Sequence, residues 1–252
     1  MPWDPELYLK FKEERFAPFE DLLSLIRVRK GLRVIDLGCG TGELTTRLAD
    51  RLPGSVVQGI DSSPEMIRKS SAFSHPGITF AHGSIEDAKG IWDLVVSNAA
   101  LHWIEDHRAL IPHLLSLVTP GGQLAVQVPA NHRHRSHTAI LETAAEEPFH
   151  TALEGWSRQS PVLEIEEYAE LLYEHGGREL TVYAKVYPHL LPDADTVAEW
   201  TAGSTLVPYF ERLPPELHDQ FMDSYRDKLQ QFWPDSPVLY TFRRIFLSAV
   251  KG

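Results

Sequence analysis

Short apolar runs alternate with amphipathic segments between Arg33 and Pro129, and this alternation restricts the fold more than any other feature of the chain. Each run is rich in Val, Ile and Leu and has the length of a strand, whereas the segments between them carry apolar residues at helical spacing. Strands that are apolar on both faces are typical of a parallel sheet covered by helices on both sides. We therefore expect an α/β fold with strands at 33–38, 56–61, 78–83, 92–98 and 123–129.

The chain on either side of this alternation is less regular. Residues 5–30 carry apolar residues at helical spacing, and we expect Pro18 to divide them into two helices. Pro120 to Gly122 reads as a turn, 163–177 as a helix, and 179–191 and 238–250 as two strands that pair antiparallel. The pattern predicts N-terminal cap helices at 1–30, a core at 31–128, 163–191 and 238–252, and insertions at 129–162 and 192–237 that add to a helical cap.

Charge and composition exclude several classes of partner. The net charge is −11, whereas a protein that holds nucleic acid needs a basic face for the phosphates, and the chain has one short cationic cluster at 132–137. No apolar run approaches the ~18 residues of a membrane span. Cys39 is the single cysteine, which fits a reducing compartment. We expect a cytoplasmic monomer or homodimer that binds neither nucleic acid nor membrane.

A glycine-rich segment, DLGCGTG at 36–42, follows the first predicted strand and precedes a predicted helix. Its glycines permit a tight turn and a close approach of the backbone to a ligand. A dinucleotide site needs the third glycine one residue later, and Glu43 would repel a pyrophosphate at the helix start. S-adenosylmethionine (SAM) carries a sulfonium and an ammonium and no phosphate. The spacing therefore favours SAM over NAD, with contacts from Asp36, Gly38, Cys39, Gly40 and Gly42.

Further candidates for the cofactor lie at the ends of the next strands. Asp61 ends the second strand, where an acid can accept hydrogen bonds from both ribose hydroxyls, and Ser63 is better placed than Asp61 to cap the next helix. Ser62 adjoins Asp61, and Met66 could pack on the adenine or belong to the core. We also assign two loop residues after the third strand to the adenine edge, with a plain loop as the alternative: Ser84 and Ile85.

The loop after the fourth strand lies where a Rossmann-like sheet forms its ligand crevice. Asn98 could contact the methionine part of SAM, and Leu101 is assigned to the cofactor site beside it. His102 and Trp103 could line the opening for methyl transfer, although a His-Trp pair is often structural.

The segments VIDLGCGTGELT, GIDSSPEMI and VVSNAALHW resemble the class I SAM-dependent methyltransferases. The whole chain is similar to the trans-aconitate 2-methyltransferase family, in Trp3-Asp4-Pro5, in Glu199-Trp200-Thr201 and in the strand with Arg244 and Phe246. The resemblance implies a Rossmann-like, mostly parallel sheet with the last strand antiparallel. It implies that Tyr8 and Arg15 close over the SAM carboxylate, and that a methyl group passes to a small polyacid, leaving S-adenosyl-L-homocysteine.

The acceptor decides which residues take part in catalysis. A carboxylate is ionised at neutral pH and needs no general base, but cationic or hydrogen-bonding groups must hold it. Arg244 and Tyr209 are candidates, and Arg243 faces away from Arg244 because neighbours on a strand point to opposite faces. An amine or hydroxyl acceptor would need a base, for which His102 is the first candidate. Methylation of another small molecule, an NAD-type oxidoreductase and a non-catalytic SAM-binding module stay open, and no metal ligands are assigned.

Overall fold

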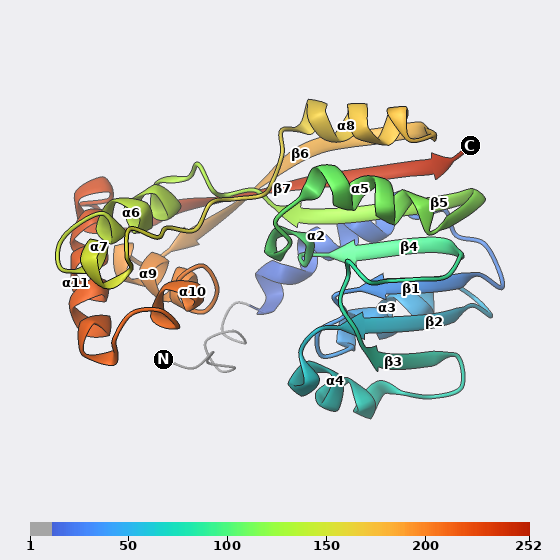
Figure 1. The fold of residues 1–252 in the computed structure, drawn as a ribbon, viewed down its shortest axis with the longest axis horizontal. Coiled ribbons are helices and arrows are strands. Elements are labelled where there is room, and N and C mark those ends of the chain that lie inside the picture. Colours follow the sequence, from blue (N-terminus) through green and yellow to red (C-terminus); the bar gives the residue numbers. More distant parts are fainter. Residues whose placement is uncertain (1–11) are drawn as a thin grey trace. The chain divides into compact units, whose positions relative to one another are not determined.

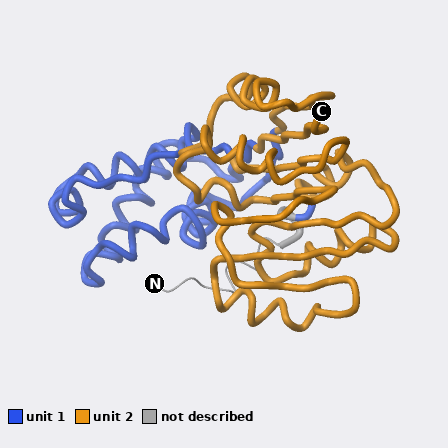
Figure 2. Tube along the Cα trace, turned by 45° about the vertical axis from the view of Figure 1, so that its right-hand side comes forward, with its two compact units in different colours: residues 1–16, 130–160, 186–243 blue, residues 17–129, 161–185, 244–252 orange. Residues whose placement is uncertain are grey.

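The computed structural model describes residues 12–252, with side chains from Phe16 onward. The chain divides into two compact units (Figure 2). Unit 1 comprises 1–16, 130–160 and 186–243, and unit 2 comprises 17–129, 161–185 and 244–252. The domain ranges expected from the sequence stay a prediction. The units divide the chain differently, because two long strands each contribute residues to both.

A seven-stranded sheet forms the frame of unit 2 (Figure 1). Its order is β3-β2-β1-β4-β5-β7-β6; β1 to β5 pair parallel, and β7 pairs antiparallel with β5. The parallel strands confirm the α/β fold that the alternating pattern predicts, and the antiparallel β7 confirms the Rossmann-like sheet that the resemblance implies. The strands are β1 (Arg33–Leu37), β2 (Val56–Asp61), β3 (Ile78–His82), β4 (Trp92–Asn98), β5 (Val118–Pro129), β6 (Gly177–Leu191) and β7 (Val238–Lys251).

Helices lie between these strands along the chain. In unit 2, α5 and α8 pack against each other. The unit contains α3 (Glu43–Arg51), α4 (Pro64–Ser70), α5 (His107–Ser116), α8 (Ile165–Glu174), the 3-10 turns η1 (Ser71–Phe73) and η2 (Leu101–Trp103), and most of α2 (Lys12–Leu25). Unit 1 contains α6 (Arg135–Ala144), α7 (Phe149–Ala152), α9 (Ala194–Ala202), α10 (Val207–Phe210), η3 (Pro215–Leu217) and α11 (His218–Phe232). No helix in residues 12–252 has the length and apolar character that crossing a membrane requires.

Apolar burial explains why these segments form strands. Four of the five residues of β1 are buried, as are the four residues at the centre of β4. Parallel strands with both faces covered lose nearly all contact with water, which favours the continuous Val, Ile and Leu runs of the sequence. Unit 1 has a separate core of aromatic and aliphatic side chains, with Phe149, Phe221 and Tyr225 fully or almost fully buried.

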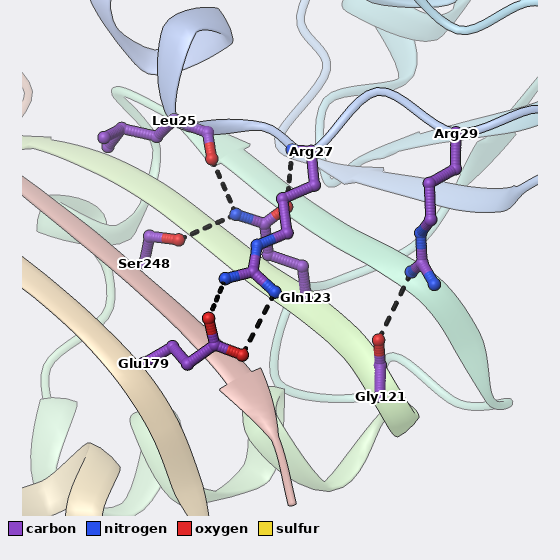
Figure 3. Close-up of polar contacts among 7 residues, drawn as sticks. All are labelled: Leu25, Arg27, Arg29, Gly121, Gln123, Glu179 and Ser248. Carbon is purple, nitrogen blue, oxygen red and sulfur yellow. Dashed lines mark hydrogen bonds and ion pairs between the residues drawn. The ribbon is translucent and has the colours of Figure 1, made fainter.

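Polar contacts fasten the segment after α2 to the sheet (Figure 3). The Gln123 amide nitrogen on β5 donates to the Leu25 carbonyl at 2.7 Å and to the Ser248 hydroxyl at 2.8 Å. Its amide oxygen accepts the backbone N–H of Arg27 at 2.9 Å, and the Arg27 guanidinium pairs with Glu179 on β6. A buried amide on the sheet thus has partners for its donor and its acceptor.

Two local predictions differ from the structure. Pro18 does not end a helix: α2 continues through it from Lys12 to Leu25. A proline removes one backbone donor from a helix, but burial of Phe19, Leu22 and Leu23 just beyond it favours continuation. The predicted turn at 120–122 lies within β5, where the pairing with β4 shifts register: Trp92 pairs with Val118 and Leu94 with Gln123.

Candidate functional site

The glycine loop between β1 and α3 is tied to the end of β2. The backbone N–H groups of Gly38 and Cys39 donate to the Ile60 carbonyl at 2.8 and 2.9 Å. Gly38, Gly40 and Gly42 have φ angles of 77°, 55° and 82°, in the left-handed region that favours glycine. The loop therefore has a fixed path across the carboxyl ends of two neighbouring strands.

The three glycines serve different purposes. A Cβ on Gly38 would overlap the Cβ of Ala100, and one on Gly42 would come within 2.7 Å of the Phe80 ring. A Cβ on Gly40 would meet no described atom within 4 Å. Packing thus requires the first and third glycines, whereas the second leaves open space beside the backbone, as a bound ligand needs.

Asp61 joins the loop to the start of α4. Its Oδ2 accepts the Gly40 N–H at 2.9 Å and its Oδ1 accepts the Ser63 N–H at 2.8 Å. Each carboxylate oxygen has a further lone pair, so two ribose hydroxyls can still donate to it. The prediction that Ser63 caps the helix is confirmed, because its hydroxyl accepts the Met66 N–H at 3.3 Å. Cofactor contacts by the exposed Ser62 and the half-buried Met66 stay predictions.

Asp36, on β1 shortly before the loop, is buried and hydrogen-bonded to α3. It is 5% exposed, and the Thr45 hydroxyl of α3 donates to its Oδ2 at 2.6 Å. Burial raises the pKa of Asp36 to about 6; the Thr45 hydrogen bond opposes the rise and the charge of Asp61 adds to it. Burial also raises the pKa of the Cys39 thiol, with the charges of Asp36 and Asp61 adding to the effect, so this thiol stays protonated at neutral pH. Direct cofactor contacts by both residues stay predictions.

The chain after β4 has an unusual backbone. Ala99 has a φ of 53°, which a residue with a Cβ seldom adopts, and its N–H donates to the Gln127 carbonyl of β5 at 2.9 Å. The preceding residue, Asn98, has a buried side-chain Oδ1 that meets no hydrogen-bond donor in the described part of the chain. An acceptor in this position at the carboxyl edge of the sheet suits a donor on a bound ligand.

The 3-10 turn η2 follows Ala99 and is held by a hydrogen bond from His107. Leu101 is 1% exposed, and its carbonyl takes part in a 2.8 Å hydrogen bond with Nε2 of the buried His107. The other ring nitrogen of His107 contacts the Tyr168 hydroxyl of α8, and burial lowers the pKa of His107. A neutral imidazole thus holds the turn against α8. His102 is half-buried, and its ring centroid lies 4.8 Å from that of Trp103.

The candidates in the loop after β3 and those for the acceptor have different surroundings. The Ser84 hydroxyl donates to Asp87 at 2.8 Å within an exposed turn, while Ile85 is 7% exposed and adjoins Gly38. Arg244, at 8% exposure, lies on β7 opposite Pro129. Tyr209 belongs to the core of unit 1, where its hydroxyl accepts the Arg158 N–H at 3.1 Å.

The remaining candidates belong to the N-terminal segment or to unit 1. Tyr8 falls outside the described residues, and the side chain of Arg15 is likewise not described. The cationic cluster 132–137 lies in unit 1 at the start of α6. His134 caps that helix and stacks on Trp233 with ring centroids 5.8 Å apart, and Arg135 lies over the Phe232 ring. Part of the cluster therefore serves packing within its own unit.

Comparison with known proteins places the chain in a family. The Methyltransferase domain family matches residues 8–176. A trans-aconitate 2-methyltransferase from Deinococcus radiodurans is 46% identical over 100% of this chain and 99% of its own length. One from Mycobacterium tuberculosis is 38% identical over 99% of this chain and 97% of its own. The chain belongs to the trans-aconitate 2-methyltransferase family.

Solved structures agree with the fold of this methyltransferase. The YcgJ protein from Bacillus subtilis has a TM-score of 0.62 at 13% identity, covering 94% of this chain and 98% of its own. Phosphoethanolamine N-methyltransferase 2 from Haemonchus contortus, in complex with S-adenosyl-L-methionine, has a TM-score of 0.56 at 17% identity, covering 94% of this chain and 52% of its own. The predicted class I methyltransferase fold and the dependence on SAM are confirmed.

The described residues fit SAM. Gly40 leaves room beside the loop, Asp61 retains acceptor capacity for the ribose, and Asn98 presents an acceptor that suits the ammonium of the amino-acid end. Residues 36–43 include Asp36 and Glu43 and no basic side chain, an environment that suits a cation and disfavours pyrophosphate. The NAD-type alternative is thereby set aside.

Sequence reasoning missed Gln127. It lies on β5, is 0% exposed, and neither atom of its amide has a hydrogen-bond partner among the described residues. A signal was present, because a glutamine inside the apolar run LAVQVP breaks the pattern of a buried strand. Two glutamines occur on β5, and only the structure separates the one with partners, Gln123, from the one without, Gln127.

Proposed function

We propose that this methyltransferase transfers the methyl group of SAM to a carboxylate of trans-aconitate, giving a methyl ester and S-adenosyl-L-homocysteine. The observation that carries the proposal is the end-to-end match to relatives of that name, at 46% identity over 100% of the chain. Matches confined to the cofactor half would support methyl transfer in general. A match that also spans the insertions supports a shared acceptor.

For methyl transfer to a carboxylate, the protein mainly has to bind the two substrates and align them. When bound, SAM supplies an activated methyl group, which a carboxylate oxygen takes as the carbon–sulfur bond breaks and its electron pair stays on sulfur. The acceptor oxygen is already ionised at neutral pH, so no side chain has to remove a proton. Holding an acceptor in line with the methyl can supply roughly 7–11 kcal/mol of the barrier.

Arg244 is our candidate for holding the acceptor. A chain with a net charge of −11 opposes the approach of a polyacid, and only close, partly desolvated cations overcome that field. A guanidinium binds two carboxylate oxygens at once and keeps its charge when buried. Arg244 is 8% exposed and lies near the edge of the sheet where β5 ends, which supports this role.

The other assignments enter the proposal with their own support. Asp61, Gly40 and Asn98 would hold the cofactor, with Tyr8 and Arg15 closing over it as the resemblance implies. Tyr209 stays a candidate to hydrogen-bond the acceptor. Its hydroxyl already accepts the Arg158 backbone N–H within unit 1. The match to relatives named for trans-aconitate supports an anionic small-molecule acceptor. The net charge of −11 argues against a nucleic-acid partner, and the single cysteine fits a cytoplasmic location, with either a monomer or a homodimer.

Product analysis tests the proposal. Purified protein is incubated with methyl-labelled SAM and a panel of trans-aconitate, other di- and tricarboxylates, amines and phenols. We expect label on trans-aconitate, released as methanol by mild base, which is diagnostic of an ester. A base-stable product on an amine or phenol, with no label on the acids, would contradict the proposal and make His102 the candidate general base.

A further inference from the structure

Gln127 on β5 carries a fully buried amide. It is 0% exposed, and in residues 12–252 neither Oε1 nor Nε2 meets a hydrogen-bond partner. A buried polar group without a partner lowers stability, so such groups are rare in native proteins and each calls for an explanation. Ser97 on the neighbouring strand β4, by contrast, donates to the Leu37 carbonyl at 2.8 Å.

Gln123 shows what a structural glutamine looks like on this strand. It lies four residues before Gln127 on β5, and side chains an even number apart share a face of the sheet. Its nitrogen donates to Leu25 and Ser248, and its oxygen accepts from Arg27 (Figure 3). The two glutamines thus share residue type, strand and face, and differ in that one fastens the fold and the other does not.

The sheet register places Gln127 at the ligand edge. Gln127 pairs with Asn98, the last residue of β4, so their side chains are neighbours on one face. On the other side Gln127 lies opposite Phe246 of β7, and Arg244, two residues from Phe246, shares that face. Gln127 therefore stands between an amide assigned to the cofactor and a buried guanidinium assigned to the acceptor, against the apolar ring of Phe246.

The order of strands indicates which ligand lies there. Asp61 ends β2, the glycine loop follows β1, Asn98 ends β4 and Gln127 lies on β5, and these four strands are adjacent in that order. At about 4.8 Å per strand, Gln127 is roughly 14 Å along the edge from the proposed ribose contact. With Asp61 at the ribose and Asn98 at the amino-acid end, the cofactor would occupy the edge up to β4, and β5 would face what lies beyond the methyl group.

We propose that the Gln127 amide binds the methyl acceptor, with Nε2 donating to a carboxylate oxygen beside Arg244. This inference rests on the proposed function, because it assumes an acceptor that carries carboxylates. A neutral donor adds specificity for a second oxygen without placing another cation next to the sulfonium. Gln127 is thus a specificity-determining residue of the acceptor site, and the acceptor supplies the partner that the fold does not.

The same substitution at the two glutamines tests the assignment, because methionine keeps the length and shape of glutamine without its polar atoms. We compare Gln127→Met with the matched control Gln123→Met, and add Gln127→Leu as a second form of the first variant. Each protein is measured for unfolding without ligands, for S-adenosyl-L-homocysteine affinity by calorimetry, and for kcat and KM with trans-aconitate at saturating SAM.

We expect Gln127→Met and Gln127→Leu to unfold at the wild-type temperature or above it, since they remove a polar group without a partner. Their kcat/KM for trans-aconitate should fall about 10- to 100-fold, the loss of a hydrogen bond to a charged group, with the affinity for S-adenosyl-L-homocysteine within about twofold of wild type. Gln123→Met should do the reverse: a lower unfolding temperature and unchanged kinetics.

Two results would overturn the assignment. If the Gln127 variants unfold earlier and retain wild-type kcat/KM, the amide is structural and pairs with a neighbour such as Asn98. If they lose affinity for S-adenosyl-L-homocysteine with an unchanged KM for trans-aconitate, the amide binds the cofactor instead. A wild-type enzyme that esterifies no polyacid would refute the proposed function, and this assignment with it. The two failures are distinguishable: in the first the wild type has no activity on polyacids, and in the second the wild type is active and the Gln127 variants match it.

Discussion

Two glycines of the same loop should respond differently to the same added methyl group, one mainly in stability and the other mainly in cofactor affinity. At Gly38 an alanine must adopt a φ of 77°, and its Cβ would overlap that of Ala100 and lie 3.5 Å from Ile85. The backbone strain costs about 1–3 kcal/mol. Overpacking of a close contact costs a further 1–3 kcal/mol. We therefore expect Gly38→Ala to lower the free energy of unfolding by roughly 2–6 kcal/mol, a large part of the stability of an ordinary domain.

Gly40 offers the matched comparison. Its φ of 55° also disfavours alanine, but the new Cβ would meet no described atom within 4 Å. We expect Gly40→Ala to lose about 1–2 kcal/mol of stability, the cost of the left-handed conformation alone. The methyl group would occupy the open side of the loop, so the affinity for S-adenosyl-L-homocysteine should fall at least about tenfold, equivalent to about 1.4 kcal/mol.

Urea unfolding without ligand measures the first quantity, and calorimetry with S-adenosyl-L-homocysteine measures the second. The reasoning requires the two variants to separate: Gly38→Ala mainly loses stability, and Gly40→Ala mainly loses affinity. Equal losses of stability, with cofactor affinity intact in Gly40→Ala, would show that the open side of the loop is not where the cofactor binds.

Three further variants test single side chains. Burial raises the pKa of Asp36 from 3.8 to about 6, so the wild-type protein loses stability as this carboxyl ionises with pH rising to about 6. The free energy of unfolding of Asp36→Asn should therefore rise relative to wild type, by up to roughly 3 kcal/mol, between pH 4 and 7. A difference in urea unfolding that does not depend on pH would refute this. Asp61→Ala removes the acceptor for Gly40 and Ser63 and should lose both stability and about 10- to 100-fold in S-adenosyl-L-homocysteine affinity; unchanged calorimetry would exclude the ribose role. Arg244→Lys keeps the charge but loses the planar fork, so kcat/KM for the acceptor should fall at least about tenfold with cofactor affinity unchanged; a fall in cofactor affinity would argue against acceptor binding.

The sheet of unit 2 could be predicted from the sequence because each of its elements has a local signal. The apolar runs became β1 to β5 within a few residues, and the glycine spacing gave the loop after β1. Pro18 shows the limit of local rules: whether a helix tolerates a proline depends on the burial of Phe19 and Leu22, which only the tertiary structure supplies.

The candidate site was less accessible to sequence reasoning, because burial and partners decide the role of a polar residue. Asp36 belongs to the glycine motif, and only the structure shows that its carboxylate is buried and accepts a hydrogen bond from Thr45. Tyr209 is a candidate to hold the acceptor, and only the structure shows that its hydroxyl also accepts the Arg158 backbone N–H within unit 1. Gln127 drew no attention, since a glutamine in a strand carries no motif and its lack of a partner appears only when its neighbours are known.

The place of β7 in the sheet has a consequence for how the chain matures on the ribosome. β7 is the last strand in sequence, but it lies between β5 and β6, which are complete long before it is made. Until residues 244–251 emerge, β5 and β6 each present an unpaired strand edge, and such edges recruit other chains. Nascent chains stalled or truncated before this strand should therefore be the aggregation-prone species, and chaperone dependence should end with its synthesis.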